Sequence, residues 1–404
     1  MSVIAAPVAD PSNVFRIGLG EATGAVADLG VMVPLATALV LVNGLDAGTV
    51  FVCAGLLAIA SGAVFRIPFP VQPLKALTAV AVAQGLAPGV IHAAGLELGA
   101  FLLILAIGGI ADRIARVFTK PVVRALQLGV GVLLAIAAVR LVVTPPEVFA
   151  GTPSAPWPWI LAIGTFAGVV FAARSRRYWV ALIILLVGCA VVVVAAPPSL
   201  AAPGLTLPHP RLPAVADFGT AFFLLVVPQL PLTFGNAVVA VSDLAHDEFG
   251  PRAVRVTPSR VCSSAGIGNV ATAMLGGMPM CHGAGGLTAH VRLGARSAGM
   301  NLLLGSAFVL LGLVFASQIP VLLGLLPVWA LAAFLVYAGA RHAWLVRDQR
   351  GADLAMAVVA GGLGAWLGNL AVTAGLALVW VHGRGIAERR RARRTEGVRE
   401  PVAS

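Results

Sequence analysis

Long apolar runs separated by short polar stretches make up most of the chain. Windows of about 20 apolar residues, the length that a helix needs to cross a bilayer, give fourteen candidate segments when shorter windows are allowed at glycine and proline. They start near Phe15, Gly48, Leu74, Gly89, Val122, Trp157, Tyr178, Phe218, Pro258, His282, Ala298, Ile319, Asp353 and Leu370. The pattern predicts an all-α polytopic membrane protein whose last two segments are short enough to be half-spans.

Composition excludes a water-soluble fold. The chain has 404 residues, of which 59% are hydrophobic and 11% charged, whereas soluble domains carry about 25% charged residues. Four cysteines, with no pair spaced as C-x-x-C, make neither a disulfide framework nor a zinc site. We therefore expect one integral membrane unit with no cofactor and no metal.

Arginine and lysine positions indicate the orientation. With the N-terminus inside, the inside loops receive Arg66, Arg113, Arg116, Lys120, Arg124, Arg174, Arg176, Arg177, Arg252, Arg255, Arg260, Arg292, Arg296, Arg341, Arg347 and Arg350. The outside loops receive only Arg140 and Arg211. Because cytoplasmic loops carry the excess of basic residues, we expect both termini in the cytoplasm and the protein in the inner (plasma) membrane. The basic tail, 384–404, fits anionic lipid headgroups better than nucleic acid.

A proline-rich stretch divides the chain into two halves. The segment Ala196–Asp217 contains six prolines and has little apolar periodicity, which is typical of an external linker. Seven segments on each side mean that the second half enters the membrane with opposite polarity. The sequence therefore predicts a 7+7 inverted repeat, with a first repeat at 1–195, a linker at 196–217 and a second repeat at 218–383.

The two halves share an interruption in their third segments. IPFPVQPLK (Ile67–Lys75) breaks the first half, and LGGMPMCHGAGGL (Leu275–Leu287) breaks the second. Proline removes a backbone donor and glycine weakens a helix, so each site predicts an extended lead-in followed by a half-helix in segments 3 and 10. Irregular backbone at membrane depth is tolerated where it lines a cavity, and paired breaks in two repeats point to a binding site.

The residues at these breaks suit an anion. Two facing half-helix N-termini contribute roughly +0.5 charge each, and Lys75 adds a full charge, giving about +2. Gln72 and His282 offer side-chain N–H groups, and the turn at Gly283 and Gly285 offers backbone N–H groups as an anion nest. This combination predicts a site for a tetrahedral oxyanion dianion. For His282 a helix-capping role is an equally weighted alternative.

Three carboxylates are candidates for coupling transport to protons. Glu21 and Asp28 lie on one helix face of the first span, and Glu97 lies in the apolar fourth span. For Glu97 the alternative is a structural partner of a cation such as Lys75. Glycines in the first span and the prolines of PQLPLTFGN in the eighth, which contains Gln229, predict that both spans are broken beside the cavity.

The motifs PVQPLK (Pro70–Lys75), PQLPLTFGN (Pro228–Asn236) and MPMCHGAGGL (Met278–Leu287) resemble those of the molybdate transporters in the sulfate permease superfamily. The resemblance covers nearly the whole chain. It implies a uracil-permease-like fold in which a core group of segments 1–4 and 8–11 moves against a gate group of segments 5–7 and 12–14. Carried over by position, it implies an oxyanion site lined by Gln72, Lys75, Gln229, Cys281, His282 and Gly283. Cys281 is also read as a small packing residue.

The first motif departs from the family pattern. The family commonly has GDLGT, whereas here Ala27 precedes Asp28 and Val31 replaces the threonine, which removes a hydroxyl contact. Only about twenty residues follow the last span, so the chain resembles the minimal transporter without a regulatory domain.

We expect a secondary active transporter of a tetrahedral oxyanion, molybdate ahead of sulfate, driven by symport of a cation such as the proton. A nucleobase permease and a passive anion channel stay open as alternatives. An intramembrane enzyme is disfavoured because neither H-E-x-x-H nor G-x-S-x-G occurs. The expected partners are the anion and the lipid bilayer, and a homodimer is consistent with the resemblance.

Overall fold

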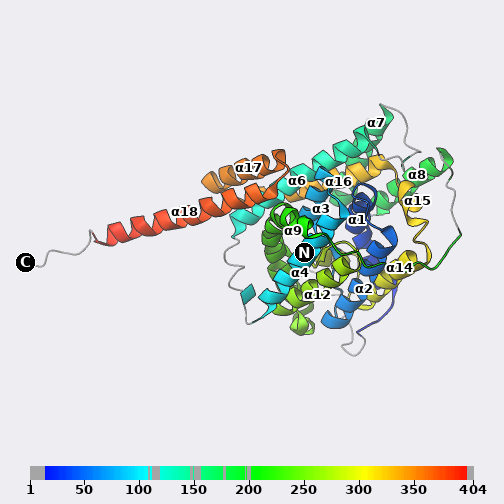
Figure 1. Cartoon of the computed structure of the whole chain (residues 1–404), viewed down its shortest axis with the longest axis horizontal. Coiled ribbons are helices and arrows are strands. Elements are labelled where there is room, and N and C mark those ends of the chain that lie inside the picture. The colour runs from blue at the N-terminus through cyan, green and yellow to red at the C-terminus, as the bar shows by residue number, and fades with distance from the viewer. Residues whose placement is uncertain are drawn as a thin grey trace, which may run out of the picture.

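The computed structural model describes residues 14–107, 110–111, 119–145, 149, 156–175, 179–195, 197 and 202–397. Helices gather into one body, and α18 (Leu370–Gly397) extends out of it toward the C-terminus (Figure 1). Within the described residues, four helical stretches are long and apolar enough to cross a membrane: Ala47–Phe65, Pro88–Ala106, Lys120–Val143 and Val328–Asp348. Further apolar helices of 10–17 residues accompany them.

The first half contains one short strand between its second and third helices. Its elements are α1 (Leu19–Leu41), α2 (Ala47–Phe65), β1 (Gln72–Pro73), α3 (Lys75–Gln84), α4 (Pro88–Ala106), α6 (Lys120–Val143), α7 (Trp157–Ser175) and α8 (Trp179–Ala195). The third helix has only 10 residues, too few to cross a bilayer by itself.

The second half repeats this order. It begins with α9 (Val215–Ala221), a π-helical stretch Phe222–Val226, α10 (Val227–Leu232), a second π-helical stretch Thr233–Ala240, and α11 (Val241–Phe249). After a 3₁₀ turn at Gly250–Arg255 come α12 (Pro258–Met274), β2 (Met280–Cys281), α13 (Ala284–Arg292), α14 (Gly299–Val314), α15 (Ile319–Gly324), α16 (Val328–Trp344), a 3₁₀ turn at Leu345–Asp348, α17 (Gly351–Trp366) and α18.

The expected breaks in segments 3 and 10 are present. Each consists of a two-residue strand followed by a short helix, β1 with α3 and β2 with α13. Before β1 the chain leaves α2 through Arg66, whose φ of 58° is left-handed, and before β2 it turns at Gly276 with φ 82°. These breaks fit the uracil-permease-like fold that the resemblance implies, while the count of fourteen segments stays a prediction.

The expectation that the first and eighth spans are broken was wrong. Helix α1 continues from Leu19 to Leu41 with Pro34 inside it. The eighth span runs as one helical rod through Pro228 and Pro231, with the wider π-helical stretches on either side of α10. A local π turn can absorb a missing N–H donor, so a proline within a membrane helix need not end it.

Glycine pairs join the two halves of the chain. Helix α2 packs on α14 where Gly55 meets Gly305, and α4 packs on α12 where Gly99 meets Gly266. At Gly55 a Cβ would lie 2.4 Å from the Gly305 carbonyl oxygen, and the reverse distance is 2.5 Å. Small residues at helix crossings let backbones approach closely, which replaces the hydrophobic effect as the source of stability in lipid.

The same kind of contact occurs between α6 and α16. A Cβ on Gly131 would lie 2.5 Å from the Gly339 carbonyl oxygen. The α2–α14 and α4–α12 contacts also correspond to each other under an exchange of the two halves, because α2 and α4 occupy in the first half the places of α12 and α14 in the second. This correspondence is what an inverted repeat requires.

Two connecting regions differ from simple linkers. Residues 202–214 have no helix or strand, but Gly204 and Thr206 donate backbone hydrogen bonds to Val314 and Leu313 at the end of α14. Thus the proline-rich linker lies against the second half before α9 begins at Val215. The basic tail expected from residue 384 starts inside α18, which stays helical to Gly397.

Candidate functional site

The two interruptions meet in a small antiparallel sheet. Gln72 pairs with Cys281 and Pro73 pairs with Met280. The Leu74 N–H adds a hydrogen bond of 3.2 Å to the Pro279 carbonyl. Two segments about 200 residues apart in the sequence are thereby fixed side by side, as paired breaks in two repeats predict.

A half-helix follows each strand directly. Helix α3 starts at Lys75, just after β1, and α13 starts at Ala284 with Gly283 as its N-cap residue. Because β1 and β2 are antiparallel, the two helices leave the sheet in opposite directions, and both N-termini stay beside it. Neither N-terminus carries a side-chain cap from its own N-cap residue.

Gln72 connects the first turns of the two half-helices. Its Oε1 accepts a hydrogen bond of 3.0 Å from Lys75 Nζ. Its Nε2 lies so close to α13 that a Cβ on Gly286 would be 2.7 Å away, and Pro70 Cβ would be equally close to that Cβ. Glycine at position 286 is therefore required for the approach of α13 to the β1 segment. Lys75 itself is half-buried.

The first turn of α13 presents backbone donors at an opening. The N–H groups of Gly286 and Leu287 both donate to the Gly283 carbonyl, at 3.0 and 3.3 Å. Ala284 and Gly285 supply the N–H groups that a helix start leaves without intrahelical partners. Gly285 is exposed, and a Cβ built on it meets nothing within 4 Å. Open space next to helix N–H groups is the geometry of an anion site.

His282 is fully buried, and both of its ring nitrogens have partners. Nδ1 lies 2.8 Å from the Pro70 carbonyl, and Nε2 lies 3.1 Å from the Ser264 hydroxyl. A neutral ring that donates from Nδ1 and accepts at Nε2 satisfies both contacts. The ring also packs on Phe69, with centroids 4.9 Å apart. These contacts join the lead-in segment of α13 to that of α3 and to α12, and neither of them is the helix-capping contact that was the alternative role for His282. Ligation of the anion by His282 remains a prediction.

Gln229 holds the start of α3. Its Oε1 accepts a hydrogen bond of 3.1 Å from the Leu77 N–H, and its Nε2 donates to Thr233 Oγ1 at 3.1 Å. The side chain is 3% exposed. It therefore caps the first turn of α3 from the eighth span, and the predicted direct contact with the anion would require one of these bonds to be exchanged.

Two further residues singled out from the sequence are Cys281 and Asp28. Cys281 is buried within β2 beside Gln72. The side chain of Asp28 lies outside the described residues. No group of three or more His, Cys, Asp or Glu side chains that could hold a metal ion occurs in the part of the chain that the structure describes.

Glu97 is half-buried in α4. Among the residues that the structure describes, its buried Oε2 has no hydrogen-bond partner. The salt bridges of the described residues do not include Glu97, and Lys75 Nζ bonds to Gln72 instead. A structural pairing of Glu97 with Lys75 is thus absent from this conformation.

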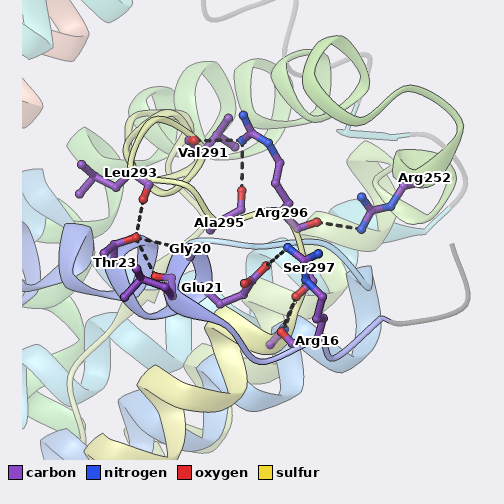
Figure 2. A network of polar contacts seen from close by, with 12 residues as sticks. Arg16, Gly20, Glu21, Thr23, Arg252, Val291, Leu293, Ala295, Arg296 and Ser297 are labelled. Atoms are coloured by element: carbon purple, nitrogen blue, oxygen red, sulfur yellow. Dashed lines mark hydrogen bonds and ion pairs between the residues drawn. The ribbon is translucent and has the colours of Figure 1, made fainter. Parts of the chain in front are cut away.

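Glu21 lies in the first turn of α1 and is fully buried. Neither carboxylate oxygen has a hydrogen-bond partner in the described part of the chain, and Oε1 lies 3.8 Å from Nη2 of Arg16, whose side chain is 54% exposed (Figure 2). Burial lowers the pKa of the Arg252 guanidinium in the adjoining 3₁₀ turn, and the charge of nearby Arg16 lowers it further. Glu21 thus places a carboxyl group beside Arg16 and near Arg252.

Polar contacts fasten α1 to the loop that follows α13. Figure 2 shows Thr23 Oγ1 directed at the Leu293 carbonyl, 2.6 Å away, and Ser297 Oγ directed at the Arg16 carbonyl, 2.8 Å away. The His290 ring adds a contact of 2.8 Å to the Gly24 carbonyl. The half-helix α13 is therefore held by the strand pair at its N-terminus and by α1 at its C-terminal end.

Sequence reasoning missed four polar residues around the site. Ser264 contacts His282, and Asn269 and Asn301 hydrogen-bond to the two lead-in segments. His342 of α16 lies within electrostatic reach of Lys75, and its buried Nδ1 has no hydrogen-bond partner within the described ranges. For Asn269 and Asn301 the available signal was an amide side chain within a predicted membrane span, which marks a functional or bridging position in a membrane protein.

Sequence comparison matches the segments that build this site. Residues 20–134 and 221–341 match the family described as "Molybdate transporter of MFS superfamily". The chain belongs to the molybdate transporter family. Molybdate transporter 1 of Arabidopsis thaliana is 31% identical over 381 residues, covering 83% of this chain and 81% of its own. Molybdate transporter 1 of Chlamydomonas reinhardtii is 31% identical over 447 residues, covering 82% and 84%.

Solved structures give the fold. The transmembrane domain of the cyanobacterial bicarbonate transporter BicA has a TM-score of 0.61 at 16% identity, covering 89% of this chain and 96% of its own. Murine Slc26a9, an anion transporter in the inward-facing state, has a TM-score of 0.65 at 12% identity, covering 96% and 74%. This member of the molybdate transporter family is therefore a multi-pass membrane transporter of an anion, and not an enzyme, as predicted.

Proposed function

We propose that the protein is a secondary active transporter of a tetrahedral oxyanion, with molybdate the first substrate and sulfate the second. The anion binds between the N-termini of α3 and α13. The observation that carries the proposal is the position of Gln72 in β1, whose amide oxygen contacts Lys75 of α3 and whose amide nitrogen lies at the first turn of α13. Membership of the molybdate transporter family and 31% identity to named molybdate transporters support the choice of substrate.

The charge at this position suits a dianion. Two helix N-termini of roughly +0.5 each and the Lys75 ammonium together provide about +2. Gln229 takes one N–H of α3 for itself, so the half-helix α13 and Lys75 supply the larger share of the free donors. The open space at Gly285 is where the anion would reach the N–H groups of Ala284 and Gly285.

Uptake of a dianion needs a driving force. An inside-negative membrane potential opposes its entry by about 2.3 kcal/mol per charge per 100 mV. Symported cations, protons in our proposal, offset this penalty by one charge each. Glu21, Asp28 and Glu97 are the candidate carboxylates. Glu97 combines membrane depth with a buried oxygen that lacks a hydrogen-bond partner, so it is the first to test.

We expect Glu97→Gln to flatten the pH dependence of molybdate uptake and to leave equilibrium binding nearly unchanged. The amide keeps the size of the side chain and cannot titrate. The measurement is initial uptake into proteoliposomes between pH 5.5 and 8, roughly the range in which a membrane carboxylate could exchange protons. A variant with the pH profile of the wild type would mean that Glu97 has a structural role. Glu21→Gln would then be measured in the same way.

Uptake by the purified protein tests the function itself. Proteoliposomes are loaded with buffer and given labelled molybdate, with sulfate and tungstate as competitors and with an inward proton gradient. Accumulation above the outside concentration supports a secondary transporter. Equilibration without accumulation would indicate a passive channel, and competition by uracil instead of oxyanions would favour a nucleobase permease.

The cellular setting is part of the same proposal. The protein lies in the inner (plasma) membrane, and the distribution of arginines supports cytoplasmic positions for both termini. A homodimer is proposed with it. The orientation is tested with cysteines introduced into residues 202–214 or after Gly397. Each is labelled with a membrane-impermeant thiol reagent from one side of sealed vesicles.

A further inference from the structure

We propose that Asn301 and Asn269 are positioning residues that fix the two extended lead-in segments, and thereby set where the α3 and α13 N-termini present their N–H groups. This inference rests on the proposed function, because its readout is affinity for molybdate. Both asparagines lie outside the strands and the half-helices, on α14 and α12. Both are almost completely buried, at 1% and 0% exposure.

Each asparagine pairs with a lead-in residue as a neighbouring strand would. Asn301 Oδ1 accepts from the Phe69 N–H at 2.9 Å, and Asn301 Nδ2 donates to the Phe69 carbonyl at 2.7 Å. Asn269 Oδ1 accepts from the Met280 N–H at 2.8 Å, and Asn269 Nδ2 donates to the Met280 carbonyl at 2.8 Å. A carboxamide matches a peptide group because it offers one acceptor and one donor in the same plane.

The chain has few other ways to satisfy these backbone groups. Extended backbone at membrane depth must have every N–H and C=O paired, because lipid offers no water. Pro73 stands opposite Met280 in the sheet and has no N–H to donate. Asn269 therefore completes an edge of β2 that the two-residue sheet leaves open, and Asn301 satisfies the N–H and C=O of Phe69, which lies before the sheet.

A second bond anchors each asparagine to a rigid helix. Asn301 Nδ2 also donates to the Ala58 carbonyl of α2 at 3.1 Å, and Asn269 Nδ2 donates to the Ala265 carbonyl of its own helix at 2.7 Å. Gly62 of α2 makes room for Asn301, since a Cβ there would lie 2.6 Å from Asn301 Cβ. The asparagines thus fix the positions of the lead-in segments relative to the long helices α2, α12 and α14.

The lead-in segments set the distances from the anion to the N–H groups of α13 and to the Lys75 ammonium. Met280 precedes Gly283 by three residues, and Phe69 precedes Lys75 by six. A shift of either lead-in moves the N–H groups or the ammonium away from the substrate. A binding constellation loses its effect when its groups move by more than about 0.5 Å, so these asparagines act on affinity through the backbone without touching the anion.

The test replaces each asparagine by leucine, which has a similar size and no hydrogen-bonding group. We expect Asn269→Leu and Asn301→Leu to raise the KM for molybdate by about 10-fold to 100-fold, the range that a displacement near 1 Å produces. The maximal uptake rate per folded protein should change less than the KM. Asn269→Thr and Asn301→Thr, which replace the carboxamide by a single hydroxyl, are used wherever a leucine variant fails to fold.

Asn43→Leu is the matched control. Asn43 is also buried, at 5% exposure, and its Nδ2 donates to two backbone carbonyls, those of Ala81 and Leu86 at 2.8 and 2.9 Å. These carbonyls are at the C-terminal end of α3, away from the strand pair. We expect this variant to lower thermal stability as much as the others while its KM stays within about twofold of the wild type, because the strand pair keeps its bonds.

The outcomes separate the two proposals. Wild-type proteoliposomes that take up no oxyanion would overturn the proposed function. Wild-type uptake together with an unchanged KM in folded Asn269 and Asn301 variants would overturn the positioning role alone. A KM that rises equally in Asn43→Leu would also overturn it, because the effect would then follow general loss of stability.

Discussion

Lys75→Met should weaken molybdate binding by about 10-fold to 150-fold. A hydrogen bond to a charged group contributes roughly 1.5–3 kcal/mol, and each 1.4 kcal/mol is a factor of ten in the dissociation constant. Lys75 is half-buried at the first position of α3, and its ammonium already donates to Gln72 Oε1. Removing it takes away the one lysine that the described residues place at the proposed site. Calorimetry with molybdate in detergent measures the change directly.

The second lysine of the chain provides the control. Lys120 stands at the N-terminal end of α6 and pairs with Asp348 at 2.9 Å, with 60% of its side chain exposed. Lys120→Met removes the same charge, but Arg124 still contacts Asp348 at 2.6 Å. An exposed pair is worth about 0–1 kcal/mol, so binding should be nearly normal. Equal affinity in the two variants, both folded, would place the anion away from Lys75.

The paired breaks were predictable from sequence because they follow from backbone chemistry. Proline at 68, 70 and 73 and glycine around Met278–Leu287 deny the chain a continuous helix whatever its neighbours are. The extended lead-ins and the short helices α3 and α13 are the direct result. Lys75 was recognised for the same local reason, as one charge at the start of an apolar half-helix.

The same local logic failed for the eighth span. Pro228 and Pro231 suggested a break, yet the helix continues through π-helical stretches on both sides. The outcome depends on neighbouring helices that pack against the rod, such as α3 and α6, and sequence patterns do not contain this information. Helix α1 keeps its regular path through Pro34 in a similar way.

Long-range partners were the other part that sequence could not supply. His282 stood out at a helix start, but its bonds go to Pro70, 212 positions away, and to Ser264. Gln229 was expected to face the anion, and its Oε1 instead caps α3 at Leu77. A side chain near a break has several possible uses, and only the packing of distant helices decides among them.

Gly286→Val should abolish molybdate binding and lower the stability of the protein. A Cβ at this position would lie 2.7 Å from Gln72 Nε2 and 2.7 Å from Pro70 Cβ. Gln72 is held by Lys75, and Pro70 belongs to the lead-in that His282 braces, so neither can move aside without disturbing the site. Overpacking in a well-packed interior costs about 1–3 kcal/mol, and here the strain is placed on the binding groups themselves.

Gly164→Val in α7 is the matched control, because it adds the same side chain where a Cβ meets nothing within 4 Å. It should leave uptake and thermal stability close to those of the wild type. Normal molybdate uptake by a folded Gly286→Val protein would mean that Gln72 need not lie against α13, and the proposed link between the two half-helices would be wrong.

Gly285→Val, one residue away, isolates the role of the open space. A Cβ there also meets nothing within 4 Å, so the fold should tolerate the side chain. The valine would nevertheless occupy the space from which an anion reaches the N–H groups of α13, and only glycine leaves that approach clear. We expect thermal stability near that of the wild type, together with a loss of molybdate and sulfate binding. Retained binding in this variant would move the anion away from α13, whereas lost binding with lost stability would make position 285 a packing site like 286.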